Sequence, residues 1–217
     1  MKRVIIIALI SVFVSQVQAQ SVLSGLLNKT LTKESITSIV ESVAGKVVSK
    51  LDLSVVGTWN YSAAEVQFKS SNLLAEAGGA AILSGIEGSV GKLYSKLGID
   101  ESYSFTFNSD STFTQNIKVK SNIQTLKGTY SLDEENNIIV LNYQVLGKIN
   151  IGKVSAIYAN NGVSLSILFD AKELFGMLKK ISAVASSLTS TATLAGLNGV
   201  IEQYDGMLLG YKLKRAK

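Results

Sequence analysis

The sequence predicts a mainly β protein with helical insertions, built as an eight-stranded antiparallel meander barrel. Three observations support this fold class. Apolar and polar residues alternate with a period of two from about residue 102 to residue 169, interrupted by clusters of turn-forming residues. Two stretches, 71–97 and 171–205, instead have the three-to-four-residue spacing of amphipathic helices. The composition, 47% hydrophobic and 17% charged, is that of a globular protein with a sizeable core.

Residues 1–19 have the pattern of a secretory signal peptide. The basic pair Lys2-Arg3 precedes an apolar run over residues 4–14, and Val17-Gln18-Ala19 has the small residues of a cleavage site. The run is shorter than the ~20 residues that a transmembrane helix needs. We therefore expect an exported chain that starts at Gln20, located in the periplasm or outside the cell according to the host's envelope. No cysteine follows the cleavage site, so we expect no lipoprotein anchor.

An N-terminal helical segment is expected over residues 20–55, before the barrel. Within it, residues 32–51 form an amphipathic helix, because apolar residues recur every three or four positions. These residues are Ile36, Ile39, Val40, Val43, Val47 and Leu51. Thr32 is the expected N-cap. We expect the apolar face of this helix to cover an end or a side of the domain that follows.

The barrel domain is expected over residues 56–217, and it opens with a strand over residues 56–68. Trp59, the only tryptophan in the chain, shares one face of this strand with Tyr61, because side chains alternate along a strand. Six further strands follow the same alternation between turn clusters. We expect them over residues 103–107, 113–119, 126–132, 138–146, 149–158 and 163–169.

The first helical insertion, residues 71–97, contains many glycines. Each costs ~1 kcal/mol relative to alanine inside a helix. We therefore expect either close backbone packing or a break near Gly78-Gly79. The run over residues 88–92 superficially resembles a phosphate-binding loop, but it lacks the required spacing and the Ser/Thr that binds magnesium. We assign no nucleotide site to it.

The second insertion, residues 171–205, is expected to contain two helices and to lead into a last strand over residues 207–215. Asp170 is placed to cap the first of these helices, with Glu173 in the position of a capping box. Eight strands in sequence favour a closed meander, because closure removes exposed edges. An eight-stranded outer-membrane barrel is the alternative closed barrel. The expected helices at 71–97 and 171–205 argue against it, because such barrels have no long helices between their strands.

Gly57-Thr58-Trp59 resembles the Gly-x-Trp signature of the lipocalins and other calycins. The longer pattern resembles a secreted bacterial lipocalin-like family of unknown function over residues 33–215. The stretches that carry this resemblance are Gly57–Tyr61, Ser71–Gly79, Phe105–Phe113 and Gly128–Asp133. The resemblance implies a calycin-type barrel and an exported location, and it implies no established activity.

In calycins, a basic residue near the C-terminal end of the domain often packs over the signature tryptophan. Arg215 has the matching place in the order of the chain, and we expect its cation on the ring of Trp59. Gly57, Trp59 and Arg215 are therefore the residues that the resemblance assigns to barrel closure.

The leading functional hypothesis is a non-enzymatic binding protein for an apolar or amphipathic small molecule. An eight-stranded barrel has an interior that is either filled by side chains or able to hold one small ligand. The candidates for lining such a cavity are Trp59, Tyr61, Phe105, Phe107, Phe113, Tyr130 and Tyr143. The same residues also serve as ordinary core, because aromatic residues build strands in any case.

Other functional classes are weighed against this hypothesis. The alternative is a cell-envelope interaction or structural module with a side-chain-filled barrel, whose helices would present surplus apolar surface to a protein partner. The chain has no histidine and no cysteine, which removes the usual zinc sites and nucleophile–base pairs. An enzyme would need carboxylates, such as Glu65, Asp110 or the turn acids Asp133, Glu134 and Glu135. We therefore expect no enzyme, no metal and no cofactor.

The composition also excludes nucleic acid as a partner. Removal of Lys2-Arg3 with the signal peptide lowers the net charge from +5 to +3, and the remaining lysines are too scattered to form a basic face. Residues 181–201 carry no charge, but about half of them are Ser, Thr, Asn or Gly. We expect no transmembrane span after signal removal.

Overall fold

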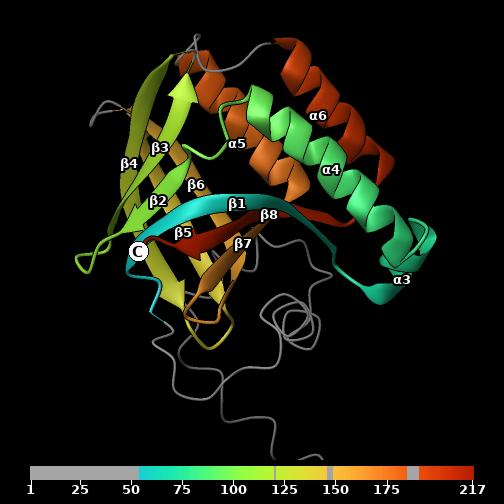
Figure 1. Ribbon diagram of the computed structural model, residues 1–217, viewed down its shortest axis with the longest axis horizontal. Helices are drawn as coiled ribbons and strands as arrows, with labels where there is room; N and C mark the ends of the chain where they lie inside the picture. Colours follow the sequence, from blue (N-terminus) through green and yellow to red (C-terminus); the bar gives the residue numbers. More distant parts are fainter. Residues whose placement is uncertain (1–53, 120, 146–148, 185–190) are drawn as a thin grey trace, which may run out of the picture.

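The computed structural model describes residues 54–217 apart from 120, 146–148 and 185–190, and Figure 1 shows how its elements are arranged. The predicted signal peptide (1–19) and the predicted helix over residues 32–51 lie outside the described residues. The described elements are β1 (Gly57–Phe68), α3 (Ser71–Glu76), α4 (Ala80–Lys96), β2 (Ser104–Phe107), β3 (Thr112–Val119), β4 (Asn122–Asp133), β5 (Ile138–Val145), β6 (Ile149–Asn160), β7 (Ser164–Asp170), α5 (Ala171–Val184), α6 (Thr191–Gln203) and β8 (Met207–Arg215).

The strands form one closed antiparallel barrel in chain order. Each strand pairs with the next, and β8 returns to pair with β1 over residues 59–68. The predicted eight-stranded meander with helical insertions is therefore confirmed. β4 begins at Asn122, earlier than the expected start at residue 126, because its first residues pair with β3 through the backbone while their side chains stay exposed.

A β-bulge between Tyr61 and Ala63 changes which side chains of β1 point inward. Before the bulge Trp59 belongs to the core, and beyond it Val66 does so. Tyr61, expected on the same face as Trp59, is left half-buried. On its other edge β1 pairs with β2 only over residues 57–60, whereas its pairing with β8 continues to Phe68. The second half of β1 therefore has an edge that another element covers.

Helix α4 covers this edge of β1. The Val66 N–H donates to Glu87 Oε1 of α4 at 3.3 Å. The first helical insertion is divided at Gly78-Gly79, as the glycine pair led us to expect, and both residues have positive φ values (106° and 74°). After α4, Gly98 accepts a hydrogen bond from the Lys118 N–H near the end of β3. The helix thus runs from the end of β1 to the end of β3.

Three helices, α4, α5 and α6, lie together at one end of the barrel, which we call the helical end (Figure 1). It is the end where β1 and β7 finish and β8 begins, at Phe68, Asp170 and Met207. Apolar side chains of these helices belong to the same core as the inward-facing strand residues. We call the opposite end, where Trp59 meets Arg215, the tryptophan end. No helix in the described part of the chain is long and apolar enough to cross a membrane.

Candidate functional site

Arg215 covers Trp59 at the tryptophan end. Its guanidinium lies 4.4 Å from the centroid of the indole ring, which is fully buried. Gly57 makes this approach feasible, because a Cβ at that position would lie only 3.0 Å from Arg215 Nη1. The indole N–H donates to the Val55 carbonyl at 2.7 Å. The structure thus contains the contact between Arg215 and Trp59 that the calycin resemblance implies.

The Arg215 guanidinium also binds three backbone carbonyl groups. It donates to the carbonyls of Gly162 at 3.1 Å, Val56 at 3.1 Å and Ser54 at 3.0 Å. These carbonyls belong to the turn between β6 and β7 and to the segment that enters β1. One side chain of the last strand therefore connects three separate parts of the chain at the tryptophan end.

Five of the seven aromatic residues predicted to line a cavity meet inside the barrel. Phe105 stacks on Phe107 with 5.3 Å between ring centroids, and Phe113 packs edge-on against Tyr143 at 5.0 Å. Tyr130 packs edge-on against Phe107 at 5.1 Å. All five side chains are buried. Their ring-to-ring contacts are those of a packed core.

Tyrosines extend this aromatic cluster toward the helical end. Tyr211 of β8 contacts the rings of Tyr94 and Tyr103, and Tyr61 packs edge-on against Tyr103. Burial raises the pKa of Tyr94 and of Tyr103 well above the usual tyrosine range, so both stay protonated. Tyr103 accepts a hydrogen bond from Gln115 Nε2 at 2.8 Å, whereas the Tyr94 hydroxyl has no partner among the described residues. A buried polar group therefore lies where α4 packs on the barrel.

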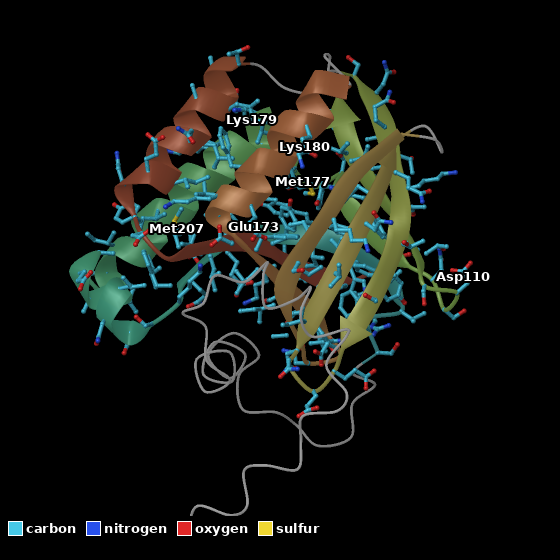
Figure 2. All side chains as sticks on the ribbon, turned by 180° about the vertical axis from the view of Figure 1, so that it is seen from behind. Asp110, Glu173, Met177, Lys179, Lys180 and Met207 are labelled. Carbon is cyan, nitrogen blue, oxygen red and sulfur yellow. The ribbon has the colours of Figure 1, made fainter. Side chains whose placement is uncertain are left out.

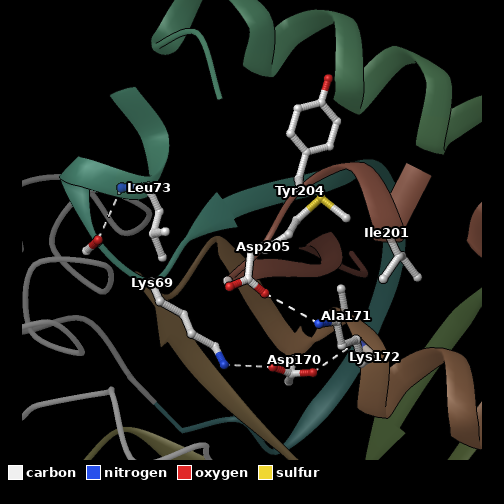
Figure 3. Close-up of a pocket in the computed structure, with 11 residues that line it drawn as sticks. Lys69, Leu73, Asp170, Ala171, Lys172, Ile201, Tyr204 and Asp205 are labelled. Carbon is white, nitrogen blue, oxygen red and sulfur yellow. Dashed lines mark hydrogen bonds and ion pairs between the residues drawn. The ribbon is translucent and has the colours of Figure 1, made fainter. Parts of the chain in front are cut away.

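A pocket of about 300 Å³ lies at the helical end (Figure 3). Three segments far apart in the sequence form it: the turn from β1 into α3, the junction of β7 with α5, and the turn from α6 into β8. Apolar and polar side chains both line it. They are Leu73, Ala171, Ile201, Tyr204 and Met207, together with Lys69, Ser70, Asp170, Lys172 and Asp205. The volume is at the lower limit of the range for small-molecule sites.

Two ion pairs define the polar side of the pocket. Lys69 Nζ lies 2.7 Å from Asp170 Oδ2, and Lys69 is only 5% exposed. The other oxygen of Asp170 accepts from the N–H groups of Lys172 and Glu173 at 3.0 and 3.2 Å, and so caps α5 as predicted. Lys172 Nζ and Asp205 Oδ1, 3.4 Å apart, form an exposed pair. Both carboxylate oxygens of Asp170 therefore accept hydrogen bonds. The Lys69 ammonium has three N–H groups but only one acceptor among the described residues.

Glu173 lies beside these charges in the first turn of α5 (Figure 2). Burial raises the pKa of its carboxyl group to about 7, with a further contribution from the nearby Asp170 carboxylate, while the Lys69 cation acts in the opposite direction. Glu173 therefore changes its charge close to neutral pH. Above that pH the polar side of the site gains a negative charge.

The sequence identified Asp170 as a helix cap and missed the rest of this site. Lys69 and Asp170 are 101 residues apart in the chain. A single lysine after a strand belongs to no motif, and nothing in the periodicity indicates that it becomes buried. The two residues meet only because β1 and β7 both flank β8 and finish at the same end of the barrel.

The carboxylates considered for catalysis lie on different parts of the barrel. Glu65, on β1, is buried, and this burial is the main cause that raises its pKa. Asp110 lies in the exposed turn between β2 and β3, where hydrogen bonds from Thr112 lower its pKa. Across residues 54–217, as far as they are described, no group of three or more Asp, Glu, His or Cys side chains forms a metal site.

A closed eight-stranded meander whose first and last strands pair, with an arginine over the tryptophan of the first strand, defines a calycin-type barrel protein. The chain belongs to a lipocalin-like domain family, DUF4923, whose model matches residues 27–215. Its fold is that of a binding protein, and lipocalin-like barrels are typically non-enzymatic.

Among solved structures, the chain is similar to a DUF4847 family protein from Bacteroides vulgatus. The two sequences are 14% identical, the match covers 82% of this chain and 98% of that chain, and the TM-score is 0.34. None of the curated proteins matches this chain.

Proposed function

We propose that the chain is an exported protein that binds a small amphipathic molecule, and that the ligand occupies the pocket at the helical end. The observation that carries this proposal is the position of the pocket, about 300 Å³, beside the buried Lys69–Asp170 pair. The aromatic interior, by contrast, consists of rings in mutual contact. The binding-protein fold supports a ligand role, and the pattern of residues 1–19 supports export.

Lys69 selects the polar part of the ligand. Asp170 balances the charge of the lysine but occupies one of its three N–H groups. Buried charged groups are stable when their hydrogen-bonding capacity is satisfied. A ligand oxygen in the pocket supplies a second acceptor, so the proposed head group is a carboxylate, sulfonate or hydroxyl.

The apolar part of the ligand lies against the other wall of the pocket. Leu73 from α3, Ile201 from α6 and Met207 from β8 provide this wall. Each methylene group that a ligand buries there contributes ~0.8 kcal/mol. The volume admits a short chain or a small ring system, which defines a small amphipathic ligand rather than a long-chain lipid.

Two fluorescent probes test the pocket: the anionic 1-anilinonaphthalene-8-sulfonate and the uncharged N-phenyl-1-naphthylamine. Both should bind to the mature protein. Leu73→Trp fills the pocket and should weaken both probes at least tenfold. The matched control is Ile123→Trp on β4, where the parent side chain is already 51% exposed, and binding should not change. Equal affinities for the two variants would contradict the assignment of the pocket.

The same probes test the role of Lys69. Lys69→Met removes the ammonium and should weaken the anionic probe several-fold more than the uncharged probe. Lys127→Met, at an exposed position on β4, is the control and should alter neither. An equal loss for both probes in Lys69→Met would contradict head-group recognition. Retained binding of the uncharged probe shows that the variant has kept its fold.

A natural ligand and the proposed export can be examined together. Mature protein purified from its own envelope should start at Gln20 and should have a native mass that exceeds its denatured mass. An excess that extracts into organic solvent would be the ligand. A cytoplasmic chain that retains residues 1–19 would contradict export.

The packed interior favours one alternative, a cell-envelope interaction or structural module that acts through its surface. This alternative predicts that neither probe binds, that the two masses agree, and that cross-linking in the envelope joins the chain to a protein partner. Probe binding that Leu73→Trp abolishes, without a cross-linked partner, would exclude it.

A further inference from the structure

A set of apolar side chains on the outside of the barrel is buried without belonging to the main core. We call it the outer patch, and it consists of Ile138, Ile157, Ala159, Leu168 and Leu208, each at most 5% exposed. Ile138, Ile157 and Leu168 lie directly opposite one another on β5, β6 and β7. Their neighbours along each strand belong to the core. Because side chains alternate along a strand, the patch faces outward.

The described helices do not cover this patch. The buried and half-buried apolar side chains described on α3, α4, α5 and α6 belong to the main core or pack against it, whereas Ile82 of α4 is exposed. That core does not include the five patch residues. Leu174 of α5 and Leu197 of α6, for example, are fully buried on the core side. Outward-facing strand residues that no described helix covers would ordinarily be exposed, so their burial indicates another cover.

We propose that the amphipathic segment over residues 32–51 packs its apolar face on the outer patch. The described chain begins close to that patch. The Ser54 carbonyl accepts from Asn160 Nδ2 at 3.1 Å and from Arg215 Nη2 at 3.0 Å. Asn160 directly follows the patch residue Ala159 on β6. The segment that precedes Ser54 therefore meets the barrel at the edge of the patch.

The length of the segment fits this position. Twenty helical residues extend ~30 Å, whereas a strand of seven residues, the length of β7, extends ~23 Å. A helix before Ser54 can thus follow the strands from the tryptophan end to the helical end. The family match also begins at residue 27, so the family's domain includes the segment.

Charge complementarity supports the same placement. Glu65 of β1 lies opposite Gly210, which in turn lies opposite Leu168 of the patch. Glu65 is buried, and its Oε2 has no partner among the described residues. On a helix over residues 32–51, Lys46 and Lys50 border the apolar stripe. Among the described residues Lys212 already favours the charged form of this carboxylate, and a lysine at that border would be a second cation beside it.

Cysteine labelling tests the proposal in the mature chain, because the natural sequence has no cysteine. Leu168→Cys should react slowly with a maleimide, and Val163→Cys, at a position 65% exposed, should react quickly. Adding Val43→Asp on the apolar stripe should accelerate labelling of Leu168→Cys at least tenfold. Adding Ser38→Asp, on the opposite face of the same helix, should leave it slow. Ile139→Cys, in the core, should stay protected throughout.

Two results would overturn the proposal. Leu168→Cys labelled as quickly as Val163→Cys would show that nothing covers the patch. Protection that survives Val43→Asp, or that falls when the protein is diluted, would assign the cover to another segment or to a second copy.

Disulfide trapping provides a second test that does not depend on the stability of Val43→Asp. Leu168→Cys is combined with Val40→Cys, Val43→Cys or Val47→Cys, and for comparison with Ser38→Cys or Ser49→Cys. A disulfide should form with at least one valine position and with neither serine position. Equal trapping at serine and valine positions, or none at all, would reject docking through the apolar face.

Discussion

Arg215 combines a cation–π contact with three hydrogen bonds to backbone carbonyls. Arg215→Lys keeps the charge but loses the planar group that lies on Trp59 and the fork of donors. The carbonyls of Gly162 and Val56 would then lack a partner. We expect the variant to lose about 2–3 kcal/mol of unfolding free energy.

Urea denaturation followed by circular dichroism measures this loss. Lys214→Ala, at the exposed neighbouring position, is the control and should change stability by less than ~0.5 kcal/mol. A comparable effect of the two substitutions would show that Arg215 does not stabilise the tryptophan end.

Glu173 should make the stability of the protein depend on pH near neutrality. Its pKa in the folded state, about 7, is above its ordinary value of 4.5, so the folded protein holds this proton more tightly than the unfolded chain. The stabilisation that results is complete below about pH 4.5 and is lost as the pH rises through about 7. Glu173→Gln, which stays neutral, should therefore gain stability relative to the parent between pH 5 and pH 8.

Urea denaturation of both proteins at the two pH values checks this expectation. Glu101→Gln, in an exposed turn, provides the control. A difference between Glu173→Gln and the parent that does not change from pH 5 to pH 8 would contradict the assignment.

At the scale of elements, helix α4 offers a matched pair of glycines. Gly98, just after the helix, has a φ of +79°, and a Cβ there would lie 1.8 Å from the Lys118 carbonyl oxygen. Gly88 lies within the helix, and a Cβ there would meet nothing within 4 Å. Gly98→Ala should therefore destabilise the protein by more than ~2 kcal/mol, whereas Gly88→Ala should stabilise it by about 0.5–1 kcal/mol.

Thermal unfolding should give a lower melting temperature than the parent for Gly98→Ala and a higher one for Gly88→Ala. A destabilising Gly88→Ala would mean that this helix face contacts something that the structure does not show. The close packing considered for the glycines of the first insertion does not apply to Gly85 and Gly88, which have open space around them, and nothing in the structure explains their presence.

The elements themselves were predicted well where burial imposes a pattern. Alternation identified the strands that bury one face, and the Gly78-Gly79 pair identified the break between α3 and α4. The start of β4 was missed, because residues 122–125 pair only through their backbone and have no hydrophobic signal. The bulge at Tyr61 was also missed, since a bulge depends on the partner strand.

At the scale of the whole molecule, the packed interior and the pocket predict different responses to a core substitution. Phe105→Ala removes a ring at the centre of the aromatic cluster and should cost about 3–5 kcal/mol of stability. Molecules that remain folded should bind 1-anilinonaphthalene-8-sulfonate with the affinity of the parent, because Phe105 does not line the pocket.

Titration of Phe105→Ala with the probe, at a temperature where the variant is folded, measures this affinity. A tenfold loss of affinity in folded Phe105→Ala would return the ligand site to the barrel interior. The sequence placed the candidate site in the barrel interior, because aromatic residues that alternate along strands can be recognised from the sequence alone. It gave no indication of the pocket, since Lys69, Asp170 and Ile201 converge only in the folded chain.

The pairing of β1 with β8 also sets the order of events during synthesis. Trp59 and Arg215 are opposite each other, so the ring of hydrogen bonds is incomplete until β8 (Met207–Arg215) has left the ribosome. Contacts between such distant parts of a chain form slowly. Until then β1 lacks the partner for its second half, and β7 keeps one open edge. A nascent chain of this topology therefore stays unclosed until β8 has been synthesised. An unclosed chain is what threading through a membrane requires under the proposed export.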